Sequence, residues 1–130
     1  MADIDIDAII AEIQRLQRTR EELLTGDLAP AGAWIHTHTI KRTYPGGITY
    51  TYEYAKWQAH EAIFSRNPKK KGKYAGITGY TKHQHIGRVG SSSGLGMDEE
   101  TEDAYRLMRN RERLEAIEKT LLEIQSLLGR

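Results

Sequence analysis

The spacing of apolar residues predicts a helix near the start of the chain. In residues 4–24 the apolar side chains recur at steps of three and four, as on one face of an amphipathic helix. They are Ile6, Ile9, Ile13, Leu16 and Leu23, with Arg20 at the position that interrupts the stripe. Three aspartates crowd the predicted N-terminus, where negative charge complements the helix dipole. Gly26 and Pro30 then indicate the end of the helix.

A longer helix is predicted at residues 98–128, with a heptad repeat along one side. Leucines recur every seven residues and isoleucines take the interleaved positions, giving the seam Leu107, Leu114, Ile117, Leu121, Ile124 and Leu128. Asn110 occupies the equivalent position one heptad before Ile117, where a polar residue often fixes the register of a coiled coil. Two interpretations stay open. The seam packs on the N-terminal helix of the same chain, or it joins two copies in a dimer.

Between the helices the period changes from about 3.6 to two. Residues 34–42 and 48–57 alternate around "YPGG" at 44–47, which predicts a β-hairpin. Residues 77–89 predict a third strand, residues 65–76 a basic loop and residues 90–96, "GSSSGLG", a flexible joint. Residues 58–64 fit either a longer strand or a short helix. The expected fold is α+β, a single domain over 1–130 with a basic β-meander at 33–89 between the two helices.

Composition limits the classes of protein that the chain can belong to. It has no cysteine, which excludes a disulfide framework, a thiolate metal site and a cysteine nucleophile. It has no apolar run of 18 residues and begins with an acidic stretch, so we expect neither a membrane helix nor a signal peptide. A soluble, cytoplasmic protein is the expectation.

Charge is sorted by region although the net charge is only +1. Residues 1–30 hold three Lys/Arg against seven Asp/Glu, and residues 98–130 hold six against nine. Residues 31–97 hold ten Lys/Arg against Glu53 and Glu61 alone, together with nine of the ten aromatic residues. A basic, aromatic middle segment between acidic ends favours a polyanionic partner.

Two His-x-His pairs raise the question of a metal site. His36 and His38 would share one strand face, and His83 and His85 another. If the two strands were neighbours, four imidazoles could meet a zinc or copper ion. No nearby carboxylate completes such a site, and the surroundings are cationic, so we favour surface histidines and expect no metal and no other cofactor.

Catalysis has little support in the sequence. The middle segment holds two carboxylates, too few for paired acid–base chemistry, and it contains neither a nucleophile elbow nor a phosphate-binding glycine loop. We therefore expect a protein that is not an enzyme and has no catalytic residues.

The tyrosine stripe at Tyr50, Tyr52 and Tyr54 has two interpretations. We favour packing of these rings against the terminal helices, which would turn Thr49, Thr51 and Glu53 outward. Otherwise the stripe is a platform on which unpaired bases stack.

Two family resemblances accompany these patterns. The "KHQHIGRVGSS" strand followed by "RNRERLEAIEKTLLEI" resembles short bacterial proteins, cyanobacterial ones among them, that have a helix, a β-hairpin, an "IG" strand and a terminal helix but no assigned role. In outline, a three-stranded sheet backed by a helix is similar to the arm-type DNA-binding domains of phage integrases. That likeness implies a DNA-binding module without integrase chemistry.

These observations predict a dimeric nucleic-acid-binding protein, with DNA favoured over RNA. The alternative is a protein–protein adaptor or self-assembling subunit that works through the heptad helix. The residues expected to contact phosphate are cations, namely Lys41, Arg42, Arg66, Lys69, Lys70, Lys71, Lys73, Lys82 and Arg88. Four more are expected in closer contact: His36, His38, His83 and Gln84.

Overall fold

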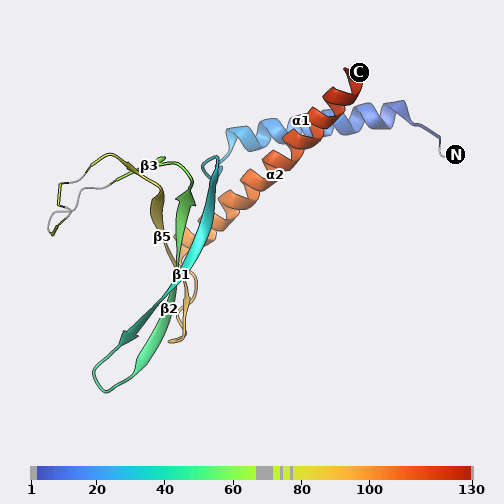
Figure 1. Ribbon diagram of the computed structural model, residues 1–130. Coiled ribbons are helices and arrows are strands. Elements are labelled where there is room, and N and C mark those ends of the chain that lie inside the picture. Colours follow the sequence, from blue (N-terminus) through green and yellow to red (C-terminus); the bar gives the residue numbers. More distant parts are fainter. Residues whose placement is uncertain (1–2, 67–71, 74, 77, 130) are drawn as a thin grey trace. The chain divides into compact units, whose positions relative to one another are not determined.

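The computed structural model describes residues 3–66, 72–73, 75–76 and 78–129 of the chain (Figure 1). Helices lie at both ends of the chain and strands between them, which confirms the α+β class. The elements are α1 (Ile6–Thr25), β1 (Ala33–Thr43), β2 (Thr49–Ala59), β3 (Phe64–Ser65), β4 (Tyr80–Thr81), β5 (His83–Ser91) and α2 (Glu99–Leu128).

The chain divides into two compact units. The helical unit consists of residues 1–29 and 107–130, and the sheet unit consists of residues 30–106. The first two turns of α2 therefore belong to the sheet unit and the remainder of α2 to the helical unit.

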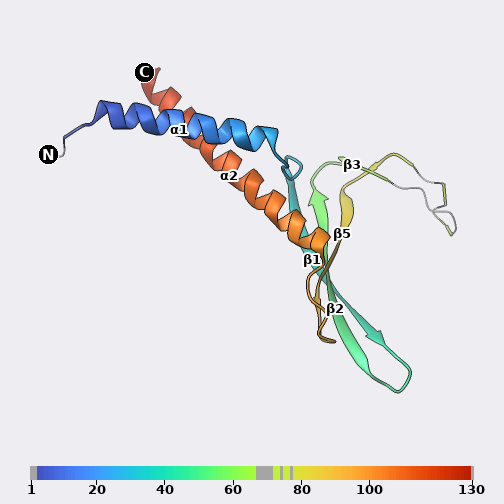
Figure 2. The ribbon, with the colours of Figure 1, turned by 180° about the vertical axis from the view of Figure 1, so that it is seen from behind.

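In the helical unit, polar contacts join the segment after α1 to α2. The Asn110 side chain donates to the backbone carbonyl of Asp27 at 3.3 Å, and Nε of Arg111 donates to the carbonyl of Ala29 at 2.9 Å. The sequence placed Asn110 where a polar residue often fixes the register of a coiled coil. In the structure its side chain instead donates to a backbone carbonyl of the same chain. Figures 1 and 2 show α1 crossing α2, and Arg20 of α1 forms an ion pair with Glu118 of α2 at 3.5 Å.

The sheet unit contains the predicted antiparallel sheet of three strands in the order β1-β2-β5. The third strand starts later than the sequence predicted, because residues 80–81 form β4 instead and pair with β3 in a separate two-stranded sheet. β5 then pairs with β2 across two irregularities, between Glu53 and Tyr54 and between Ala55 and Lys56. The ambiguous residues 58–59 continue β2, and His60 lies just beyond its end.

The β1–β2 connection and the segment that follows β5 are both tight and hydrogen-bonded. In the β1–β2 turn, the Gly47 N–H donates to the Tyr44 carbonyl, and Gly46 has φ of +97°, which glycine adopts without strain. After β5, Ser92 binds the backbone of Thr51 twice, as donor at 2.9 Å and as acceptor at 2.8 Å. The segment predicted as a flexible joint is therefore hydrogen-bonded to β2.

The core of the sheet unit lies between one face of the sheet and the start of α2. Ala55, Trp57 and Ala59 alternate along β2 and are all buried, as are Thr101 and Ala104 of α2. Strand partners share a face, so this face, which we call the helix face, also includes Gly87 opposite Ala55. A Cβ on Gly87 would lie 2.8 Å from Oγ1 of Thr101, which shows how closely α2 approaches the sheet here.

The tyrosine stripe lies on the opposite face of the sheet. Tyr50, Tyr52 and Tyr54 alternate with the buried Ala55 and Trp57, so they cannot share the face that packs against the start of α2. The sequence favoured an arrangement in which the tyrosines pack against the terminal helices and Thr51 and Glu53 point outward. For the start of α2 this interpretation is wrong. The small residues Ala55, Ala59 and Gly87 explain why this face packs against α2, because they let a helix approach closely where tyrosines would not.

Candidate nucleic-acid interface

One face of the three-stranded sheet gathers aromatic rings, imidazoles and cations. We call it the tyrosine face and define it by strand register. Its members are Trp34, His36, His38, Ile40 and Arg42 of β1, Tyr50, Tyr52, Tyr54, Lys56 and Gln58 of β2, and His83, His85, Arg88 and Ser91 of β5. The single carboxylate in these three strands, Glu53, lies on the helix face, so the strands place no acid on the tyrosine face.

A row of rings crosses the tyrosine face from β1 to β5. Tyr54 of β2 lies between His38 of β1 and His85 of β5, with ring centroids 6.0 Å apart on each side. Along β2, the ring of Tyr52 follows at 6.4 Å with an interplanar angle of 21°. Because His85 is exposed and the other three rings are partly exposed, the row is open to flat aromatic ligands such as nucleobases.

At the end of the tyrosine face next to the β1–β2 turn, Tyr44 and Tyr52 contact each other. The hydroxyls of Tyr44 and Tyr52 share a hydrogen bond of 2.8 Å. This bond is the main cause that raises the pKa of the Tyr44 hydroxyl above 10.0, with smaller contributions from desolvation and neighbouring charges. The guanidinium of Arg42 lies 5.8 Å from the centre of the Tyr52 ring, within reach of a cation–π interaction. An exposed cation is thereby held beside the aromatic row.

The two histidine pairs lie on strands that are not neighbours in the sheet. β2 lies between β1 and β5, so Lys56 separates His36 from His85, and Tyr54 separates His38 from the β5 side. Among the residues that the structure describes, no group of three or more His, Asp or Glu side chains is placed to hold a metal ion. The four-imidazole alternative required neighbouring strands, and the sheet order is incompatible with it.

The predicted nucleic-acid contacts lie in several parts of the chain. Arg42 and His83 lie on the tyrosine face, whereas Lys41 and Gln84 lie on the other side of the sheet. Arg66, Lys73 and Lys82 are exposed in the segment around β3 and β4. Lys69, Lys70 and Lys71 lie outside the described residues.

Arg88 has a structural role that sequence reasoning missed. Its Nη2 lies 3.0 Å from Oδ1 of Asp98, its Nε donates to the carbonyl of Gly96, and its backbone N–H donates to Oδ2 of Asp98. These contacts join β5 to the residue that precedes α2, so we omit Arg88 from the candidate interface.

Lys56 and Tyr44 belong to the candidate interface but were not singled out from the sequence. The signal for Lys56 was present, because it continues the alternation of Tyr50, Tyr52 and Tyr54 along β2. Tyr44 lies in the turn, where no period applies, and its place follows from its hydrogen bond to Tyr52 and from its ring contact with Tyr50 at 5.8 Å.

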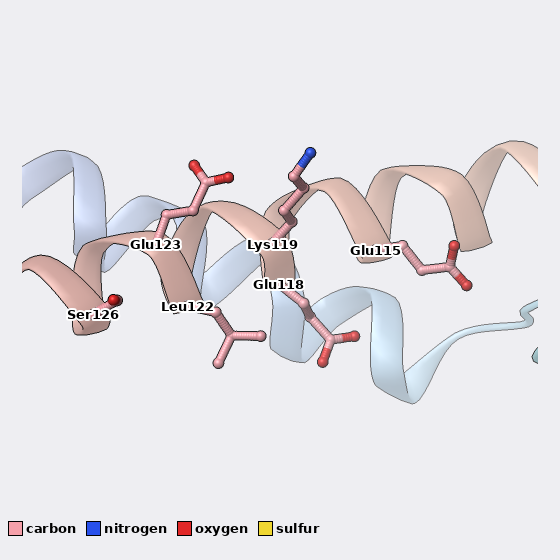
Figure 3. Close-up of a pocket in the computed structure, with 6 residues that line it drawn as sticks. All are labelled: Glu115, Glu118, Lys119, Leu122, Glu123 and Ser126. Atoms are coloured by element: carbon pink, nitrogen blue, oxygen red, sulfur yellow. The ribbon is translucent and has the colours of Figure 1, made fainter.

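The heptad positions of α2 differ greatly in exposure. Leu114 is fully buried and Ile117 nearly so, Leu107, Leu121 and Ile124 are partly exposed, and Leu128 is 79% exposed. Next to this seam, Glu115, Glu118, Lys119, Leu122, Glu123 and Ser126 line an open hollow along α2 (Figure 3). All six residues come from one helix, so the hollow lacks the converging polar groups of a small-molecule site.

Comparison of the chain with protein-family models, with curated proteins and with solved structures finds no match to any of them. Both family resemblances drawn from the sequence therefore stay predictions. Neither α1 nor α2, over its described residues, has a stretch apolar enough to cross a membrane.

Proposed function

We propose that the protein is a non-enzymatic nucleic-acid-binding protein, with DNA as the favoured ligand and the tyrosine face as the contact surface. The observation that carries the proposal is the distribution of charge and aromatic rings over the two faces of one sheet. The helix face holds the core and Glu53, whereas the tyrosine face holds Arg42, Lys56 and the aromatic row without a carboxylate.

The chemistry of the tyrosine face matches both parts of a nucleic acid. Arg42 and Lys56 provide positive charge for phosphates, and affinity then arises largely from counterion release. Tyr52, Tyr54 and the flanking imidazoles provide rings for stacking or for hydrogen bonds to base edges. The lysine-rich loop at 69–73 adds further cations along the chain, and we include it in the proposal as a source of phosphate contacts.

The test is fluorescence anisotropy with labelled duplex DNA, single-stranded DNA and RNA of equal length at two salt concentrations. The double variant Lys56→Ala, Tyr54→Ala should lose most of the affinity, at least about tenfold, since stacking on one ring alone contributes about 1–3 kcal/mol. The matched control, Lys119→Ala with Tyr105→Ala, removes the same side-chain types from α2 and should bind as the wild type does. Near-UV circular dichroism verifies that both variants fold. Equal affinity of the two variants would refute the tyrosine face as the contact surface.

A second candidate function, self-association, has an observation of its own in the helical unit. No residue of α1 is buried, and Ile6, Ile9 and Ile10 are between 47% and 59% exposed. On α2, Leu122, Leu127 and Leu128 are each more than 60% exposed. We propose that a second copy of the chain covers these side chains, because exposed apolar side chains that gather on one part of a protein are typical of a protein–protein interface.

Sedimentation velocity over a range of concentrations tests this candidate. A dimer that becomes a monomer in Ile9→Lys, Leu128→Lys supports it. A wild type that remains monomeric at high concentration excludes it.

A further inference from the structure

The β1–β2 hairpin continues beyond the rest of the sheet as a two-stranded arm. Pairing of β5 with β2 ends at Tyr52, and the hydrogen bonds of Ser92 extend the contact only to Thr51. We call residues 42–50 the arm. Its strands pair only with each other, Arg42 with Tyr50 and Thr43 with Thr49. Figures 1 and 2 show the hairpin running past the end of β5.

The arm is open to solvent on both sides. Every residue from 39 to 49 is exposed, and the apolar side chains of Tyr44 and Ile48 are 42% and 54% exposed. A two-stranded hairpin without a third strand or a covering layer is at best marginally stable in water. Side chains on both sides of this arm therefore lack the cover that other residues of the sheet have, which points to a ligand that encloses the arm.

The positive charge at the base of the arm favours an anionic ligand. Lys41 and Arg42 stand at its base, and residues 28–52 contain no Asp or Glu. The remaining polar groups are suited to hydrogen bonding. Thr43 and Thr49 project on one side, with their hydroxyls 2.9 Å apart, and Tyr50 projects on the other side.

The dimensions of the arm match the major groove of B-form DNA. Three residues beyond Thr51 extend about 10 Å at about 3.4 Å per residue, and the groove is about 8.5 Å deep. The groove is also about 12 Å wide, enough to admit a two-stranded ribbon, whereas the minor groove at about 6 Å is too narrow. A groove contacts both sides of the ribbon, while a single strand stacked on the tyrosine face would leave one side of the arm uncovered.

We propose that the arm enters the major groove of B-form duplex DNA, with its tip at the base edges and with Lys41 and Arg42 at the phosphates that border the groove. This inference rests on the proposed function and specifies its ligand as a duplex. Lys41 and Arg42 stand at the base of the arm, where the phosphates would lie, and Ile48 at the tip is suited to the methyl group of thymine.

The test compares the wild type with an arm-shortened variant, in which Asn-Gly replaces residues 42–50 so that Lys41 and Thr51 flank a two-residue turn. Each protein is titrated with a DNA duplex, an RNA duplex and single-stranded DNA. The wild type should prefer the DNA duplex over the RNA duplex by at least about tenfold, since the major groove of A-form RNA is too narrow for side chains to read. The arm-shortened variant should lose this preference while retaining the tryptophan fluorescence spectrum of the wild type, because Trp34 and Trp57 lie outside the replaced residues.

Two further measurements test whether the arm lies in the major groove. Arg42→Ala should weaken duplex binding and reduce the slope of log affinity against log salt by about 0.9, and the control Lys119→Ala should leave both unchanged. Guanine N7 atoms should be protected from dimethyl sulfate by the wild type but not by the arm-shortened variant.

The outcomes separate this inference from the proposed function. Duplex binding that survives arm shortening, or complexes in which guanine N7 stays fully reactive, would overturn the inference alone. Failure of the wild type to bind any of the three probes at low salt would overturn the proposed function and the inference together.

Discussion

The guanidinium of Arg88 and the carboxylate of Asp98 form an ion pair, with Nη2 of Arg88 3.0 Å from Oδ1 of Asp98. The other carboxylate oxygen accepts the backbone N–H of Arg88 at 2.9 Å. The backbone N–H of Asp98 in turn donates to the Arg88 carbonyl, and the Asp98 carbonyl accepts the N–H of Glu102. Asp98 thus joins the end of the sheet to the first turn of α2.

Replacing Asp98 with alanine should destabilise the sheet unit. The variant leaves two donors of Arg88 without an acceptor, and hydrogen bonds to charged groups contribute about 1.5–3 kcal/mol each. Urea unfolding followed by tryptophan fluorescence should therefore show a loss of at least about 1.5 kcal/mol. The control is Asp103→Ala, which removes an exposed carboxylate 3.7 Å from Arg106 and should change stability by less than about 0.5 kcal/mol. Equal effects of the two substitutions would contradict this role of Asp98.

The contact between Gly87 and α2 makes a second prediction. In Gly87→Ala, the new Cβ would lie 2.8 Å from Oγ1 of Thr101 and 3.0 Å from Oδ2 of Asp98. Thr101 is fully buried, so its side chain has little room to move, and overpacking of this kind costs about 1–3 kcal/mol. Gly90→Ala is the matched control in the same strand, because its Cβ meets only the Leu95 carbonyl at 3.8 Å. Thermal unfolding should separate the two variants clearly, and a Gly87→Ala protein as stable as Gly90→Ala would argue against this packing.

The hydrogen bond between Tyr44 and Tyr52 predicts a dependence on alkaline pH. The pKa of the Tyr44 hydroxyl is raised above 10.0, mainly by this bond. The bond therefore stabilises the folded arm fully below pH 10 and is lost as the pH rises through the folded pKa. In an absorbance titration, Tyr44 should ionise above its ordinary pH, and Tyr52→Phe should bring its ionisation back toward that value. Tyr80→Phe, which removes an exposed tyrosine from β4, should leave the ionisation of Tyr44 unchanged.

The heptad leucines of α2 should differ in their contribution to stability. Leu114→Ala removes a fully buried side chain and should cost about 2–5 kcal/mol. Leu128→Ala removes a side chain that is 79% exposed and should cost much less in a monomer. Chemical unfolding at low protein concentration measures both. A large effect of Leu128→Ala that grows with concentration would instead indicate that a second copy covers it.

The lysine-rich loop should contribute to the salt dependence of binding. Replacing Lys69, Lys70, Lys71 and Lys73 with alanine should weaken binding and reduce the slope of log affinity against log salt by about 0.9 for each phosphate that is no longer neutralised. Circular dichroism should be unchanged, because lysine side chains are seldom part of a core. A variant whose slope equals that of the wild type would remove the loop from the interface.

Much of the fold followed from periodicity alone. Steps of three and four predicted α1, the heptad leucines predicted α2, and alternation on either side of "YPGG" predicted the hairpin. These predictions succeed because side-chain direction is set locally, by 3.6 residues per turn in a helix and by two in a strand. The same alternation placed the tyrosines together on one face, and His36 and His38 together, before the register was known.

Tertiary structure decided which elements became neighbours, and hence what each face does. Placement of β2 between β1 and β5 separated the two histidine pairs. The small residues Ala55 and Gly87 allowed α2 to approach one face, which left Tyr54 on the other. Alternation cannot distinguish a tyrosine stripe that is covered from one that is open, because it fixes only which side chains point the same way. Which side is buried depends on shape complementarity between segments that are distant in sequence, and that appears only when the chain is folded.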